Sequence, residues 1–76
     1  MMAQQESFAV VLFESVSHAL RAEKLIKAAG ISCKLIPVPR HLSSDCGVCL
    51  RFAIKDLEPI KNTLLSRIDH FEIQPL

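Results

Sequence analysis

Two cysteines separated by two residues, Cys46 and Cys49, are the residues of this sequence best suited to chemistry. Thiols at this spacing can form a disulfide, bind one metal ion, or divide the roles of nucleophile and resolving thiol. A proline-containing segment at residues 37–45 precedes the pair, and an alternating apolar stretch at residues 48–54 contains its second member. The pattern therefore places both thiols where an exposed loop enters a strand.

Cys46 has the sequence surroundings of a reactive thiol. Gly47 leaves little steric cover beside it, and Arg40, His41 and Arg51 are nearby cationic or titratable side chains. Neighbouring positive charge favours the thiolate, which is the nucleophilic form of cysteine. We therefore expect Cys46 to be the most reactive of the three thiols.

The other two cysteines are distinguished by their phase along the predicted strands. Cys49 is out of phase with Leu50 and Phe52, so we expect it on the sheet face that the helices do not cover. It is either a resolving thiol, a second metal ligand or a small packed residue. Cys33 is in phase with the apolar residues around it, and we expect it to pack under the helices, since free cysteine is often buried.

Composition indicates a small globular chain without a strong electrostatic partner. The 76 residues are half apolar and 22% charged, which suits one domain over residues 1–76 with a flexible start at residues 1–6. Nine Lys and Arg against eight Asp and Glu give a net charge of +1, and their scatter argues against nucleic-acid or membrane binding. Without a basic leader or a long apolar run, and with three cysteines, the chain is expected to be cytoplasmic with reduced thiols.

The spacing of apolar residues, together with the residues that begin or end helices and strands, predicts four strands and two helices. Apolar residues run continuously through residues 8–13, as in a central strand covered on both faces. Helical spacing follows at residues 16–29 until Gly30, and again at residues 57–67 after Asp56, a suitable N-cap residue. The remaining strands are predicted at residues 31–36, 48–54 and 70–74, the last closed by Pro75.

The predicted order β-α-β-β-α-β favours an α+β ferredoxin-like sandwich, in which an antiparallel sheet carries both helices on one face. Another two-layer α+β arrangement is the alternative. In the ferredoxin-like case, the connection at residues 37–45 lies at the same end as the start of the first helix. Cys46 should then face Ser15, Ser17 and His18 across a shallow pocket where the helix end favours an anion. The residues expected to bind cargo or an anion there are Ser17, His18, Arg40, Ser44, Gly47 and Arg51.

Two stretches carry a family resemblance, residues 17–31 and residues 35–47. The second contains Ile-Pro-Val-Pro-Arg at residues 36–40 and continues through Ser-Asp-Cys-Gly at residues 44–47 to Leu-Arg-Phe at residues 50–52. From Phe8 to Pro75 the chain resembles the small selenium/sulfur carrier protein-like family. The resemblance implies a carrier that holds sulfur or selenium on the cysteine matching Cys46. The position matching Cys49 is often another small residue in that family, which puts a mechanism requiring both thiols in doubt.

Three functions are compatible with these observations. A chalcogen carrier, more a shuttle than an enzyme, would hold a persulfide or selenosulfide on Cys46, with Cys49 closing a disulfide on release. It needs donor and acceptor proteins of sulfur or selenium metabolism and no resident cofactor. A zinc or copper site at Cys46 and Cys49 is the second function, although one such pair supplies only half of a tetrahedral zinc site.

The third function is a non-catalytic interaction module that dimerises through its open sheet face. The run at residues 8–13 presents apolar side chains to both sides of the sheet. A monomer would leave part of that surface in water, so a homodimer or a partner over the sheet is expected. RNA binding through the sheet is disfavoured, because the stacking aromatic residues of RNA-binding sheets are absent from the third strand.

Overall fold

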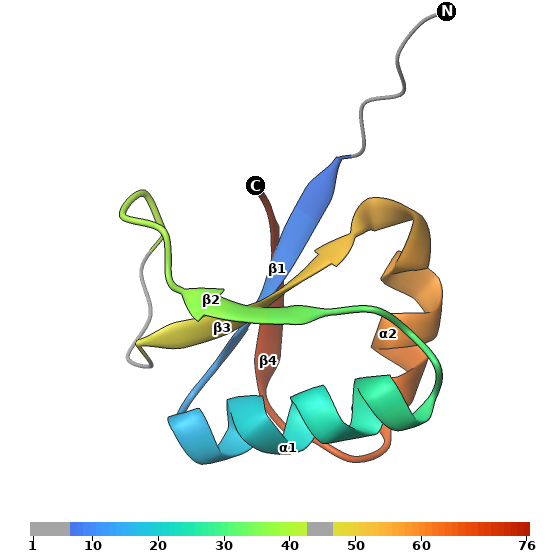
Figure 1. Ribbon diagram of the computed structural model, residues 1–76. Helices are drawn as coiled ribbons and strands as arrows, with labels where there is room; N and C mark the ends of the chain where they lie inside the picture. Colours follow the sequence, from blue (N-terminus) through green and yellow to red (C-terminus); the bar gives the residue numbers. More distant parts are fainter. Residues whose placement is uncertain (1–6, 43–46) are drawn as a thin grey trace, which may run out of the picture.

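The computed structural model describes residues 7–42 and 47–76 (Figure 1). Along the chain it contains β1 (Phe8–Phe13), α1 (Val16–Ala28), β2 (Lys34–Pro37), β3 (Val48–Ala53), a 3-10 turn at Ile54–Asp56, α2 (Leu57–Leu65) and β4 (Phe71–Pro75). The strands form one antiparallel sheet in the order β2-β3-β1-β4. The predicted α+β class is therefore confirmed, with a four-stranded antiparallel sheet and two helices.

β1 is a central strand with both faces buried, as the continuous apolar run predicts. It pairs with β3 on one side and with β4 on the other, and residues 9–13 are all buried. Ala9, Val11 and Phe13 point to the face on which both helices pack. The helix-side core also contains Ala19, Ala22, Ile26, Leu50, Phe52, Ile60, Leu64 and Ile68.

The opposite face of the sheet has a smaller core that the chain itself covers. Val10, Leu12 and Cys49 form this second cluster, with the partly buried Ile36, Val38 and Leu42 packed against it. Val10 is 0% exposed and Leu12 6% exposed within a single chain. The expectation that a monomer would leave this apolar surface in water is therefore wrong, because the segment following β2 folds back over it.

α1 ends in a left-handed glycine turn, which explains why β2 begins later than predicted. Gly30 has φ +80°, its N–H donates to Lys27 O at 3.0 Å, and the N–H of Ile31 donates to Ile26 O at 3.1 Å. This is the hydrogen-bond pattern of a Schellman motif. Residues 31–33 complete that turn, so β2 covers Lys34–Pro37 and not the predicted 31–36.

α2 and β4 also differ from the predicted boundaries. Asp56 occupies the N-cap position of α2 after a 3-10 turn, but its side chain makes no capping hydrogen bond. The helix ends at Leu65, since the chain turns there and buries Ile68, whose N–H donates to Leu64 O at 2.8 Å. Pro75 is the last residue of β4, and the proline is tolerated because β4 is an edge strand.

None of the helices in the described part of the chain is long and apolar enough to span a membrane.

Candidate functional site

The loop between β2 and β3 lies at the same end of the sheet as the start of α1, as the topology predicted. Leu12 near the end of β1 pairs with Cys49 near the start of β3, and Cys49 also pairs with Ile36 of β2. The Val38 N–H donates to Gly47 O at 3.1 Å, which closes the base of the loop. Figure 1 shows the described part of this loop, residues 38–42, on the same side of the molecule as the first turn of α1.

Two predicted site residues, Cys46 and Ser44, lie outside the described residues, which stop at Leu42 and resume at Gly47. The expectation that Cys46 faces the start of α1 therefore remains a prediction.

The first turn of α1 presents an exposed polar group at this end. Ser15 is the N-cap residue, and its Oγ accepts a hydrogen bond from the His18 N–H at 3.3 Å. The same oxygen lies 2.7 Å from His18 Nδ1, so the imidazole is held against the cap. Ser17 and His18 are exposed, and the first turn carries no acidic residue. The positive end of the α1 dipole is thus not neutralised by its own first turn.

The predicted cationic residues fall into two groups. Arg40 and His41 are exposed on the described part of the loop. Arg51 instead lies on β3, four residues beyond Gly47, which corresponds to about 13 Å of extended chain. Its guanidinium lies over the Phe8 ring, 4.6 Å from the ring centroid. The structure therefore places Arg51 with Phe8 and not beside Ser17 and His18.

Cys49 lies on the face away from the helices, as predicted, and it is fully buried at 0% exposure. Its Sγ is 4.0 Å from the carbonyl oxygen of Pro37, and Val38 and Leu42 belong to the apolar cover over its cluster. Sequence reasoning missed this cover. The available signal was the presence of two aliphatic side chains within an otherwise polar loop.

Cys33 packs against the helix-side core, as its phase predicted, but it is only partly buried. Burial raises the pKa of its thiol above the ordinary value of 9.0, the negative charge of Glu23 raises it further, and Lys27 opposes the change. Glu23 and Lys27 form an ion pair at 3.3 Å on α1. Cys49, and not Cys33, is the more deeply buried of the two described thiols.

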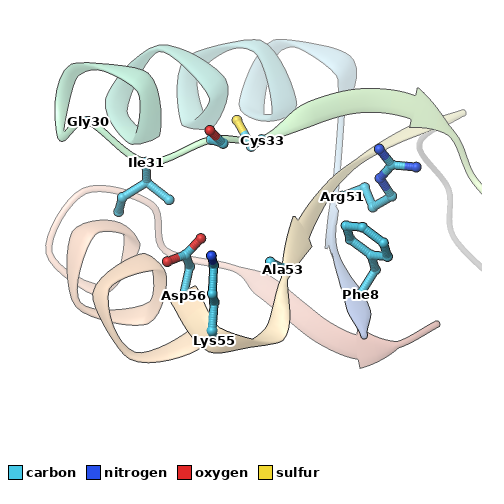
Figure 2. A pocket seen from close by; sticks show the side chains of 9 residues that line it. Phe8, Gly30, Ile31, Cys33, Arg51, Ala53, Lys55 and Asp56 are labelled. Carbon is cyan, nitrogen blue, oxygen red and sulfur yellow. The ribbon is translucent and has the colours of Figure 1, made fainter. Parts of the chain in front are cut away.

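Cys33 borders a groove of about 400 Å³ at the end of the sheet opposite to the loop (Figure 2). Phe8 and Arg51 line one part of it, and Lys55 and Asp56 of the 3-10 turn line another. Because Phe8 begins β1 and residues 53–56 follow β3, this groove is separated from the Cys46 loop by the length of the strands.

Within residues 7–42 and 47–76, no three His, Cys, Asp or Glu side chains lie together in an arrangement that could bind a metal ion.

A comparison with known protein families identifies the family to which the chain belongs. Residues 8–74 match the model of the family described as "Putative Se/S carrier protein-like". The chain belongs to this family. The match runs from the first residue of β1 into β4, so it includes both helices, the segment with Cys46 and the whole sheet except Pro75. No curated protein and no solved structure matches the chain.

Proposed function

We propose that this protein is a sulfur or selenium carrier that holds its cargo covalently on Cys46. The family match over residues 8–74 is the observation that carries the proposal. The two described thiols support the choice of cysteine. Cys49 is fully buried, and the pKa of Cys33 is raised, which lowers its thiolate fraction at neutral pH. Cys46 is the remaining cysteine, and the residue that follows it in the sequence, Gly47, is exposed.

Loading is a transfer of one sulfur atom between thiols. The Cys46 thiolate attacks the terminal sulfur of a donor protein's cysteine persulfide, a sulfur–sulfur bond forms, and the donor thiolate leaves. The product is a Cys46 persulfide, and no external oxidant or reductant is consumed. A selenosulfide forms in the same way when the donor presents selenium. Delivery repeats the exchange, with an acceptor thiolate attacking the terminal atom and Cys46 leaving as its thiolate.

The start of α1 is suited to stabilise the anion that each exchange produces. Exposed Ser17 and His18 lie in a first turn without acidic residues, and Ser15 holds the His18 ring. Free N–H groups and the positive helix end favour a negatively charged sulfur or selenium. Together with Arg40, they form the proposed anion site.

In this proposal, Cys49 could act only in the release of the cargo from Cys46. Release through Cys49 would require its thiolate to attack the inner sulfur of the Cys46 persulfide, expelling hydrosulfide and leaving a disulfide that a dithiol reductant must reopen. The cover made by Val38 and Leu42 has to move before that attack. Direct delivery from Cys46 to an acceptor needs no such movement.

The fold and setting fit a small shuttle protein. The strand order β2-β3-β1-β4, with antiparallel pairs and both helices contributing to one core, supports assignment to the ferredoxin-like sandwich. We place the protein in the cytoplasm as a single domain, where thiols are kept reduced and where its donor and acceptor proteins would be available.

Mass spectrometry tests the proposal. Reduced protein incubated with a cysteine desulfurase and cysteine should gain one sulfur, and Cys46→Ser should gain none because a hydroxyl cannot form a persulfide. Cys33→Ser is the matched control and should load like the parent. Loading that survives Cys46→Ser would overturn the carrier mechanism.

Release and metal binding are separated with the same proteins. Cys49→Ala should load normally, and slower unloading in this variant would assign release to Cys49. Zinc or copper(I) retained by the parent, and lost in both Cys46→Ser and Cys49→Ala, would instead establish a metal site.

A further inference from the structure

The groove that Cys33 borders exists because β2 is shorter than the strand beside it. β2 begins at Lys34, which pairs with Arg51, whereas β3 continues to Ala53. Residues 31–33 complete the turn after α1, and a cavity of about 400 Å³ lies beside the end of β3 (Figure 2). We call this cavity the Arg51 groove, which is lined by Phe8, Cys33, Arg51, Ala53, Lys55 and Asp56 together with residues 30–32.

The backbone at the end of β3 offers a hydrogen-bond donor to this groove. The N–H of Ile54 donates to Ser7 O at 2.9 Å, on the β1 side of the strand. Backbone groups of successive residues in an antiparallel ladder point to opposite sides, so the N–H of Ala53 is directed away from β1 and toward the groove. No residue of β2 pairs with Ala53 there. The groove therefore occupies the place where one more paired strand residue would lie.

Arg51 supplies a positioned cation at one end of the groove. Its guanidinium carbon lies 4.6 Å from the Phe8 ring centroid, and attraction to a ring face orients the side chain without using its N–H donors. No acidic side chain in the described part of the chain forms an ion pair with it. Lys34 is directly opposite on β2, and like charges at such positions destabilise a sheet. A carboxylate in the groove would bind the guanidinium and offset this repulsion.

Asp56 supplies the opposite charge at the other end of the groove. Figure 2 shows Ala53 between Asp56 and the Arg51–Phe8 contact. The Asp56 side chain makes no capping hydrogen bond to α2, and it forms no ion pair with a basic residue that the structure describes. Lys55 lines the same end. The groove thus presents a carboxylate and a guanidinium that are not paired with each other, with a backbone donor between them.

We propose that the Arg51 groove binds a small zwitterionic peptide, about as long as a dipeptide, in an extended conformation. The carboxylate of the peptide binds Arg51, its ammonium group lies at Asp56, and its peptide carbonyl accepts a hydrogen bond from the Ala53 N–H. A free amino acid fits less well, because its two charged groups are joined to one carbon whereas Ala53 separates the two charged side chains.

The size and the position of the groove agree with a separate binding site. Its volume of about 400 Å³ is within the range of small-molecule sites in proteins. The strands separate it from the Cys46 loop, so this site does not depend on the carrier function proposed above.

Isothermal titration calorimetry with alanylalanine tests the site. The parent should bind this dipeptide saturably, and Arg51→Gln should bind it at least about tenfold more weakly, because the charge-assisted hydrogen bonds are lost. Arg67→Gln removes an exposed arginine outside the groove, so it is the matched control and should bind like the parent. Absence of saturable binding to the parent up to about 10 mM would overturn the inference, as would equal binding by a folded Arg51→Gln.

Modified peptides test the two ends of the groove without relying on a variant. N-acetyl-alanylalanine lacks the ammonium group and should bind the parent more weakly than alanylalanine, and Asp56→Asn should bind the acetylated peptide as the parent does. Alanylalanine amide lacks the carboxylate and should also bind the parent more weakly. Acetylated peptide that binds the parent as tightly as alanylalanine would overturn the zwitterionic mode.

Cys33 gives an independent readout, because its side chain borders the groove. Saturating alanylalanine should slow the alkylation of Cys33, measured by peptide mapping, and should leave the rate at Cys49 unchanged, since Cys49 packs in the cluster on the other sheet face. An unchanged rate at Cys33 under saturating peptide would place the bound peptide elsewhere and overturn the assignment to this groove.

Discussion

The two faces of the sheet are covered in very different ways. On one face, α1 and α2 bury side chains from β1 and β3 in an extensive core that includes Phe52, Ile60 and Leu64. On the other face, the three buried residues Val10, Leu12 and Cys49 are packed against by the end of β2 and by two loop residues, Val38 and Leu42. Both covers exclude water from β1, but only the helical one is held by regular backbone hydrogen bonds along its length.

This difference between the two covers indicates which part of the molecule can open while the rest stays folded. Regions with few buried apolar contacts open at lower free energy than the core, so the loop-side cover should open while the helix-side core stays closed. We therefore expect Cys49 to become accessible when the loop-side cover opens, while the helix-side core stays closed. The following substitutions test this difference between the helix-side and loop-side covers.

Phe52→Ala should have the largest effect, because it removes a large side chain from the helix-side core. Loss of a buried phenylalanine costs about 3–5 kcal/mol, a large part of the stability of a small domain. Urea denaturation followed by circular dichroism should show this loss or a protein that is unfolded in buffer. A loss below about 1 kcal/mol would mean that the helical cover is no firmer than the loop cover.

Leu42→Ala should have a smaller effect on stability and a specific effect on Cys49. Removal of this partly buried side chain weakens the loop-side cover by about 1 kcal/mol, which raises the population of the open form several-fold. Cys49 should be alkylated correspondingly faster in native buffer, as measured by peptide mapping. The rate at Cys33 should not change, because Cys33 packs on the other face. An unchanged rate at Cys49 would show that this segment does not control access.

Glu23→Gln should produce the smallest change, confined to Cys33. Burial and the charge of Glu23 both raise the pKa of this thiol, so removing the charge should lower the pKa and speed alkylation near pH 8. In the parent, a folded-state pKa above the unfolded value contributes stability while the thiol is protonated. That contribution is lost as the pH rises through the folded-state pKa, so unfolding free energy should fall above about pH 9. A pH profile identical in Glu23→Gln and the parent would contradict the assigned cause.

Much of the fold follows from local patterns in the sequence. The six apolar residues of β1, the alternation in β3 and the glycine after α1 each correspond to an element or a turn found in the structure. The boundaries that were wrong depend on neighbouring structure. Residues 31–33 have strand-like composition, but the Schellman turn at Gly30 uses the N–H of Ile31 before the strand can begin.

The candidate site was harder to predict, because its most informative feature is a contact between distant parts of the chain. Strand phase placed Cys49 on the correct face, yet phase says nothing about what covers that face. Val38 and Leu42 do so from a loop whose composition looked exposed. Arg51 was expected near the thiols from its sequence separation, but the extended geometry of β3 carries it toward Phe8.

The hydrogen bond from Val38 to Gly47 has a consequence for how the Cys46 loop can vary. It closes the loop at the last rung of the β2–β3 hairpin, so a change of length between these residues leaves the strand register untouched. Closing a flexible loop costs only about 0.6 kcal/mol for each doubling of its length. Residues can therefore be inserted between Val38 and Gly47 at little cost in stability, and the paired strands that support the loop keep their register.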